Sequence, residues 1–190
     1  TDGKLCSFNC IYCECGLNEN HRTRSKLPTR AEVKEALIHK LSSMQAEGVA
    51  PDVITFAGNG EPTMHPEFAG IIDDTIETRN CFFPKAKIAV LSNSTMLYKE
   101  DVFQALNKIE DNILKLDSIS DSRIGQLNVP NSPAFTFDRL LEQLCRFNGN
   151  LIIQTMFLKG EVNGESVTNT TEHEISGWLE ALKQIKPKQV

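Results

Sequence analysis

Four of the six cysteines, Cys6, Cys10, Cys13 and Cys15, lie within ten consecutive positions of the stretch CSFNCIYCECG. Thiols at this density can form disulfides, bind zinc or hold an iron–sulfur cluster. The sequence has no apolar run of membrane-spanning length and no stretch with the layout of a signal peptide. We therefore expect a cytoplasmic protein with no membrane partner. In a reducing compartment, such cysteines more often bind metal than pair with one another.

The spacing of the cysteines bears on the choice of metal. Cys6, Cys10 and Cys13 form the pattern C-x3-C-x2-C. Structural zinc usually takes four ligands, often from two separated C-x2-C pairs, and no second pair is present here. Cys81 and Cys145 are single and lie on the apolar sides of predicted helices, so we expect both to pack in the core. Three thiolates from one loop suit a cubane cluster that leaves one iron without a protein ligand.

Cys15 could complete a site of four sulfurs. Only Glu14 separates it from Cys13, which makes joint ligation of a single ion awkward. Its role stays open at this point.

Composition predicts one globular domain. With 190 residues and 40% apolar content, the chain can bury one substantial core, so we expect a single domain over 1–190. The net charge of -5 gives no general attraction to nucleic acid. A local basic stretch comprises His21, Arg22, Arg24, Lys26 and Arg30. We expect it to be a solvated face, with contact to an anionic substrate through the first three as the alternative.

Hydrophobic periodicity predicts alternating strands and helices. Strands are expected at 52–57, 87–93, 112–117 and 151–157, and one more is expected to begin at 187–190. Helices are expected at 29–46, 66–80, 100–109, 136–148 and 171–185. The first and last helices open with capping boxes, Thr29 with Glu32 and Thr171 with Glu174. The last helix is predicted to bury Leu179 among its apolar residues. We expect irregular loops over 118–135 and 158–170.

Strands separated by helices of this length imply parallel crossovers. Two closures compete, namely an open doubly wound sheet and a barrel, which would be incomplete. In both, ligands bind at the carboxyl ends of the strands. The polar residues expected there are Gly58, Asn59, Gly60 and Glu61 after the first strand, Ser92 and Asn93 after the second, Asp117 after the third, and Gln154 within the fourth. The cysteine loop precedes the first helix and is expected at the same face.

Two motifs together carry a family resemblance. The pattern C-x3-C-x-aromatic-C, with Tyr12 as the aromatic residue, and the stretch GNGEP at 58–62 resemble motifs of the radical S-adenosylmethionine superfamily. The resemblance implies an incomplete parallel (βα)6 barrel, a partial TIM barrel, with the first and last strands truncated in this chain. CIYCECG followed by TFAGNGEPTMHPEF is most similar to the subgroup containing wyosine-type tRNA-modifying enzymes.

The resemblance also implies cofactors and an activity. Cys6, Cys10 and Cys13 would hold a [4Fe–4S] cluster, whose fourth iron chelates S-adenosylmethionine. An electron donor of the flavodoxin or ferredoxin type would reduce the cluster, and cleavage of the cofactor would yield a 5′-deoxyadenosyl radical that abstracts hydrogen from an unidentified substrate.

The cofactor-binding residues that the resemblance implies come from the strand ends and the cysteine loop. Glu61 and the peptide groups of Gly58, Asn59 and Gly60 would bind the methionine ammonium. Ser92 and Asn93 would bind the ribose or the carboxylate, and Tyr12 and Met156 would pack near the adenine. Asp117 and Gln154 are the remaining cofactor-binding residues. For Ser92, Asn93 and Asp117, simple capping of the following turn is an equal alternative.

The sequence motifs do not identify the substrate. Modification of a tRNA base and activation of a glycyl-radical enzyme are the two enzymatic alternatives. A non-catalytic module that binds zinc or an iron–sulfur cluster is the alternative of another class.

Overall fold

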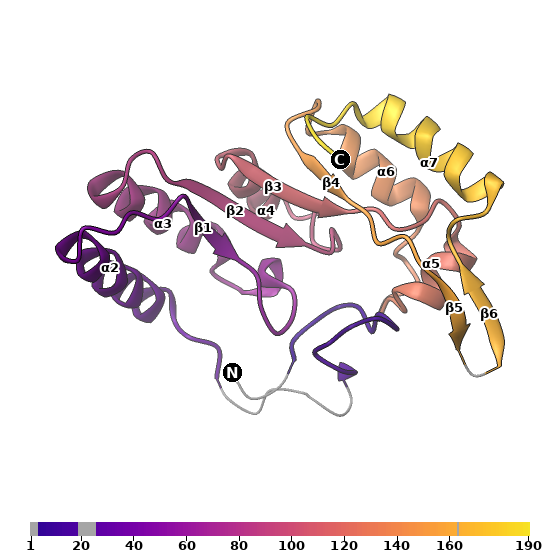
Figure 1. Ribbon diagram of the computed structural model, residues 1–190, viewed down its shortest axis with the longest axis horizontal. Helices are drawn as coiled ribbons and strands as arrows, with labels where there is room; N and C mark the ends of the chain where they lie inside the picture. The colour runs from indigo at the N-terminus through magenta and orange to yellow at the C-terminus, as the bar shows by residue number, and fades with distance from the viewer. Residues whose placement is uncertain (1–3, 19–25, 163) are drawn as a thin grey trace.

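The computed structural model describes residues 4–18, 26–162 and 164–190. Its centre is a parallel sheet of four strands in the order β1-β2-β3-β4 (Figure 1). The strands are β1 (Val53–Phe56), β2 (Lys87–Ser92), β3 (Asp111–Lys115) and β4 (Ile152–Gln154). All four lie where the sequence predicts them. The fourth is shorter than the predicted 151–157, because the chain leaves the sheet after Gln154.

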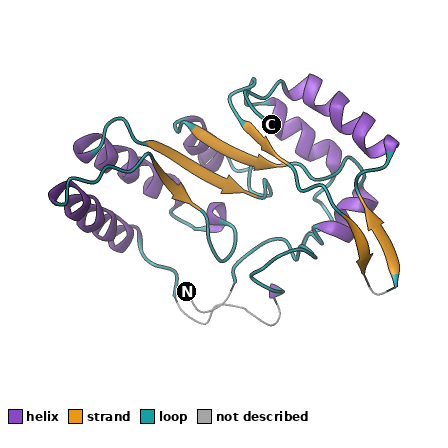
Figure 2. Ribbon diagram, in the orientation of Figure 1, coloured by secondary structure: helices purple, strands orange, loops and turns teal. Residues whose placement is uncertain are grey.

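Helices connect the strands as parallel pairing requires (Figure 2). They are α2 (Arg30–Ala46) before the sheet, α3 (Phe68–Phe82), α4 (Glu100–Asn107) and α6 (Phe137–Cys145) between strands, and α7 (Glu172–Ile185) after β4. The capping box of α2 is complete. The one predicted for α7 is only half formed: Thr171 accepts from the backbone N–H of Glu174, but the Glu174 carboxylate turns inward and accepts from Ser118 Oγ at 2.8 Å.

The strand order decides between the two closures. A doubly wound sheet reverses its order at a switch point, whereas here each strand pairs with the next one in the chain. Single parallel bridges continue this order on both sides, from Leu5 to Gly60 beside β1 and from Ile152 to Gln189 beside β4. The chain is therefore an α/β protein with a partial barrel, in which the outer two strands are represented by one bridge each.

The core lies between the sheet and its helices. Leu114 from β3, Ile72 from α3, Leu106 from α4 and Leu144 from α6 are completely buried there. Parallel strands covered by helices are expected to be this apolar. No helix of the described residues is long and apolar enough to cross a membrane.

Two burial predictions are wrong. Leu179 is 47% exposed, because α7 turns Ala181 and Ile185 toward the core instead. Cys81 is exposed near the end of α3, whereas Cys145 is partly buried and packs against the core as expected.

The two segments predicted to be irregular contain regular structure. The first holds α5 (Asp121–Leu127), which Ser120 caps by accepting from the backbone N–H of Arg123. The second holds an antiparallel pair, β5 (Lys159–Val162) and β6 (Glu165–Thr168). A short 3-10 helix, η1 (Pro62–Met64), also follows the GNGE stretch. All four elements are too short to show a clear hydrophobic period.

Replacing Leu114 with alanine should lower the free energy of unfolding by about 2–5 kcal/mol, because it leaves a cavity at a fully buried position of the sheet. Leu179→Ala is the matched control and should change it by less than about 0.5 kcal/mol, since that side chain is half exposed. Chemical denaturation measures both. Equal losses would show that the core boundary is drawn incorrectly.

Candidate functional site

The cysteine loop is fixed on one side by the GNGEP stretch. The backbone N–H of Leu5 donates to Asn59 O at 3.1 Å, and the N–H of Glu61 donates to Leu5 O at 2.8 Å. Gly60 lies between these bonds with φ +147°, and a Cβ on it would sit 1.9 Å from Leu5 O. Only glycine allows the two backbones to approach this closely.

On its other side the loop pairs with the segment that follows α5. The N–H groups of Asn9 and Ile11 donate to the carbonyls of Asn128 and Leu127 at 3.0 and 2.9 Å, and the N–H of Asn131 donates to Ser7 O at 2.9 Å. Lys4, only 2% exposed, closes the loop by donating from Nζ to Gly16 O at 2.9 Å. The loop is thus tied to the GNGEP stretch on one side and to the segment that follows α5 on the other.

Side-chain amides donate to two of the three predicted cluster cysteines. Asn93 Nδ2 lies 3.4 Å from Cys6 Sγ, and Asn128 Nδ2 lies 3.6 Å from Cys10 Sγ. Burial raises the pKa of the Cys6 and Cys10 thiols, and hydrogen bonds from Phe8 N and Asn128 partly oppose this rise. N–H donors directed at sulfur suit thiolates that carry negative charge.

No group of three His, Cys, Asp or Glu side chains in the described parts of the chain could hold one metal ion. A cubane cluster makes a different demand, since each cysteine binds its own iron. The donor set therefore has to be compared with a cluster. Three half-buried thiols on one anchored loop, two of them accepting from amide N–H groups, fit such a cluster.

The Glu61 carboxylate is buried in a shell of donors. It is 5% exposed. Its Oε1 accepts from Thr63 N at 3.0 Å, from Thr63 Oγ1 at 2.5 Å and from Ser92 Oγ at 2.9 Å, while its Oε2 accepts from Asn93 N at 2.6 Å. Burial raises the pKa of Glu61, and these donors act against the rise. Glu61 thereby joins the end of β1 to the end of β2.

Ser92 and Asn93 meet the cysteine loop through this arrangement. The Asn93 side chain donates both to Cys6 Sγ and to Ser7 Oγ, the latter at 2.9 Å, while its backbone holds Glu61. A cavity of about 170 Å³ lies beside the same strand ends and is lined by Leu5, Leu27, Ala57, Gly58, Asn59, Gly60, Glu61, Pro62 and His65. The predicted GNGE residues therefore line one cavity next to the cysteine loop.

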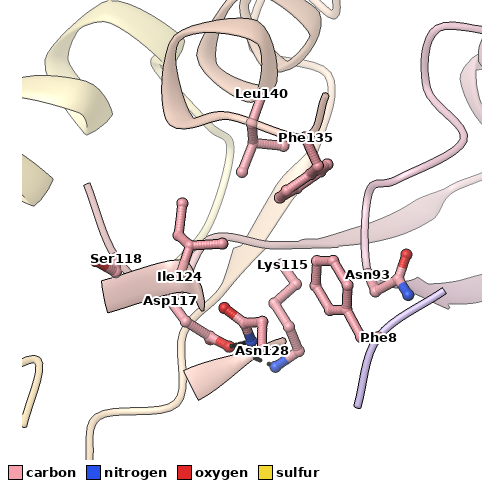
Figure 3. Close-up of a pocket in the computed structure, with 9 residues that line it drawn as sticks. All are labelled: Phe8, Asn93, Lys115, Asp117, Ser118, Ile124, Asn128, Phe135 and Leu140. Atoms are coloured by element: carbon pink, nitrogen blue, oxygen red, sulfur yellow. Dashed lines mark hydrogen bonds and ion pairs between the residues drawn. The ribbon is translucent and has the colours of Figure 1, made fainter. Parts of the chain in front are cut away.

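Tyr12 and Asp117 form a second, partly buried network at the end of β3. Figure 3 shows Asp117 of this network together with Lys115 and Asn128. The Tyr12 hydroxyl donates to Asp117 Oδ2, and Asn128 Nδ2 donates to the same oxygen at 2.7 Å. Lys115 Nζ lies 3.4 Å from Asp117 Oδ1 and 5.4 Å from the centre of the Tyr12 ring. Burial, followed by the charge of Asp117, raises the pKa of Tyr12. Asp117 thus holds the aromatic residue of the cysteine motif.

Sequence reasoning missed Lys115 and Asn128. The sequence did contain a signal for Lys115. It lies two positions before Asp117, and alternate residues of a strand face the same side of the sheet. Asn128 lies in the segment predicted to be irregular and carried no such signal.

The remaining predicted residues are less closely tied to the cysteines. Met156 is 43% exposed, and its backbone N–H donates to Asp117 Oδ1 at 2.9 Å. Gln154 is exposed at the end of β4. In the basic stretch, Arg30 pairs with Asp74 at 2.6 Å and so joins α2 to α3. His21, Arg22 and Arg24 lie outside the described residues.

Several curated proteins resemble this chain over most of its length. No protein-family model matches it. A UPF0026 protein of Helicobacter pylori is 30% identical over 165 residues, which cover 83% of this chain and 49% of that protein. A UPF0026 protein of Methanocaldococcus jannaschii is 26% identical over 191 residues, which cover 98% of this chain and 54% of that protein. The chain thus spans about half the length of these relatives.

A Brachyspira hyodysenteriae protein named GTPase Obg is 27% identical over 191 residues, which cover 98% of this chain and 26% of that protein. The present sequence contains no phosphate-binding loop of the form G-x-x-x-x-G-K-[ST]. That name therefore transfers no function to this chain.

Solved structures resemble most of the chain. SuiB of Streptococcus suis bound to S-adenosylmethionine has a TM-score of 0.66 at 17% identity, covering 98% of this chain and 37% of SuiB. BtrN in complex with AdoMet and 2-DOIA has a TM-score of 0.52 at 18% identity, and the match covers 81% of this chain and 54% of BtrN. Archaeal TYW1 has a TM-score of 0.50 at 15% identity, and the match covers 93% of this chain and 59% of TYW1. These likenesses support an α/β fold with a partial parallel barrel.

Gly60→Ala should loosen the cysteine loop, because the new Cβ collides with Leu5 O and the backbone conformation at φ +147° is strained for alanine. Amide hydrogen exchange at Leu5 and Glu61 should become faster. Gly125→Ala in α5 is the control; it meets nothing within 4 Å and should leave this exchange unchanged. Unchanged protection in Gly60→Ala would mean that the close approach does not hold the loop.

Glu61→Gln should lower the free energy of unfolding by about 1–3 kcal/mol. Donors surround both oxygens of the Glu61 carboxylate. Glutamine replaces one of these oxygens with an NH2 group, whose N–H would then face a donor that has lost its acceptor. Glu142→Gln, on the exposed side of α6, is the matched control and should have little effect. If denaturation midpoints of the two variants coincide, the donor shell around Glu61 does not stabilise the fold.

Proposed function

We propose that this chain is the core of a radical S-adenosylmethionine enzyme. The observation that carries the proposal is the anchoring of the C-x3-C-x2-C loop directly between the GNGEP stretch and the Asn128 segment. Cys6, Cys10 and Cys13 would hold a [4Fe–4S] cluster. The fold likeness to proteins solved with S-adenosylmethionine supports the choice of cofactor.

When bound, the cluster and the cofactor would supply reductive cleavage of S-adenosylmethionine and abstraction of a hydrogen atom from a substrate. The chain's own residues bind, orient and shield. Gly58 and Gly60 line the cavity and would let the backbone come close to the methionine part of the cofactor. Glu61, held by Thr63, Ser92 and Asn93, keeps this stretch in shape. Its direct contact with the ammonium group stays a prediction.

Tyr12 has a defined part in this arrangement. Its hydroxyl is held by Asp117, and its ring faces the Lys115 ammonium, so the ring cannot rotate freely between Cys10 and Cys13. The Tyr12–Asp117 network orients the cysteine loop. Because it is largely buried, it also helps to exclude water from the side of the loop that would hold the cluster. The adenine contacts expected of Tyr12 and Met156, and the cofactor contacts of Ser92, Asn93, Asp117 and Gln154, belong to the same proposal.

The proposal requires an electron donor of the flavodoxin or ferredoxin type and a substrate. A tRNA base and a glycyl-radical enzyme remain the two candidate substrates. The charge of -5 over these 190 residues supplies no attraction to RNA, so a tRNA substrate would need basic surface from elsewhere in the protein.

Anaerobic reconstitution tests the cluster. The wild-type chain should take up iron and sulfide, and its spectrum should change when S-adenosylmethionine is added. Alanine at Cys6, Cys10 or Cys13 should abolish the signal, whereas Cys81→Ala, on the exposed side of α3, should keep it. Stoichiometric zinc without iron uptake would instead favour a binding module. With the full-length protein, a strong reductant should release 5′-deoxyadenosine above the level of a Cys10→Ala control.

A further inference from the structure

A second and larger cavity has no part in the proposed function. It has a volume of about 720 Å³ and shares no lining residue with the cavity beside the GNGEP stretch. Ser7 and Thr95 line it on the side of the cysteine loop, where their hydroxyl oxygens are 2.5 Å apart. Its volume is in the range of sites that bind small molecules. We therefore asked which ligand its lining would accept.

Two strained loops form part of this cavity. Ser94 has φ +70° and lines it together with Met96, and Val129 has φ +44° and directly precedes the lining residue Pro130. The left-handed conformation is unfavourable for residues other than glycine, above all for a β-branched valine. The surrounding structure holds it at Ser94, whose backbone N–H donates to Ser92 Oγ at 3.1 Å. Backbone strain that the structure maintains in this way is concentrated at functional sites.

Large apolar side chains line the cavity from separate parts of the chain. Met64 comes from η1, Met96 from the loop after β2, and Phe135 and Leu140 from the start of α6 and the segment before it. Tyr98, which is 66% exposed, also lines the cavity. Methionine side chains are flexible and polarizable, so they can adapt to an apolar group of irregular shape. The cavity therefore suits a ligand with a large apolar part.

Two opposite charges on α6 line the same cavity. Arg139 and Glu142 are three positions apart and so lie on one face of the helix. Arg139 Nη1 donates to Ala134 O at 3.1 Å, which holds the guanidinium group against another lining residue. Among the described residues, neither side chain has an oppositely charged partner. Guanidinium N–H donors and carboxylate acceptors thus remain available to a ligand.

We propose that this cavity binds an α-amino acid with a large apolar side chain. The ligand's carboxylate accepts from Arg139, its ammonium group donates to Glu142, and its side chain lies against the apolar lining that includes Met96 and Phe135. A simple anion would be repelled by Glu142 and a simple cation by Arg139, whereas a zwitterion pairs with both. The proposal does not rest on the proposed function, since it needs neither a cluster nor S-adenosylmethionine.

Three related probes test the charge requirement on the full-length protein. L-phenylalanine is titrated and its binding followed by saturation-transfer NMR, which detects weak ligands. N-acetyl-L-phenylalanine lacks the ammonium group, and L-phenylalanine amide lacks the carboxylate. Each should bind about three- to tenfold more weakly than L-phenylalanine, because each loses one charged partner. Equal affinities, or no binding of L-phenylalanine, would overturn the proposal.

Variants place the binding in this cavity. Arg139→Met should remove the preference for L-phenylalanine over its amide, and Glu142→Gln should remove the preference over the N-acetyl compound. Ala134→Trp, at an exposed position of the lining, should block all three probes by filling the cavity. Arg123→Met, in α5 and outside the lining, is the control and should bind like the wild type. Circular dichroism checks that each variant is folded. Folded variants that all keep the wild-type preferences would show that the probes bind elsewhere and would refute the proposal.

Discussion

The close approach of two backbones, at Leu5 and Gly60, is the constraint on which the arrangement of the site depends. Their pairing continues the parallel sheet past β1 by one bridge and at the same point holds the start of the cysteine loop. A side chain at position 60 would prevent it, since its Cβ would overlap Leu5 O. The conformational freedom of one glycine therefore sets the distance between the thiols and the strand ends.

Two buried carboxylates extend this arrangement across the sheet. Glu61 connects the ends of β1 and β2, and Asp117 connects the end of β3 to Tyr12 and to the residues after α5. Each is costly to bury alone, and each is surrounded by donors that compensate that cost. Because neighbouring parallel strands end at one edge, these two networks flank the cysteine loop from adjacent positions.

The helix α5 shows how a later part of the chain completes the site. The segment after α5 runs along the cysteine loop and supplies Asn128, which contacts Cys10, Tyr12 and Asp117 together. A loop that is anchored on one side only would be free to swing; bonds on both sides restrict it. Preorganisation of this kind is what a cluster site requires, because its ligands must keep their relative positions.

The sequence alone determined the order and type of the long elements, since periodicity over ten or more residues reports which face is buried. It also determined the identity of the cysteine motif and of the GNGEP stretch, because their residue types and spacing are local properties. Local signals likewise predicted the capping box at Thr29. They did not predict that the Glu174 carboxylate accepts a hydrogen bond from Ser118, which lies far away in the sequence.

Only the tertiary structure decided how these pieces meet. Strand order excluded a doubly wound sheet, and burial reversed the expectations for Leu179 and Cys81. The pairing of Leu5 with Gly60, the contact of Cys15 with Asn59 and the recruitment of Asn128 join residues separated by 44 to more than 100 positions. No local pattern encodes such contacts, because they arise when packing of the whole sheet brings separate strand ends to one edge.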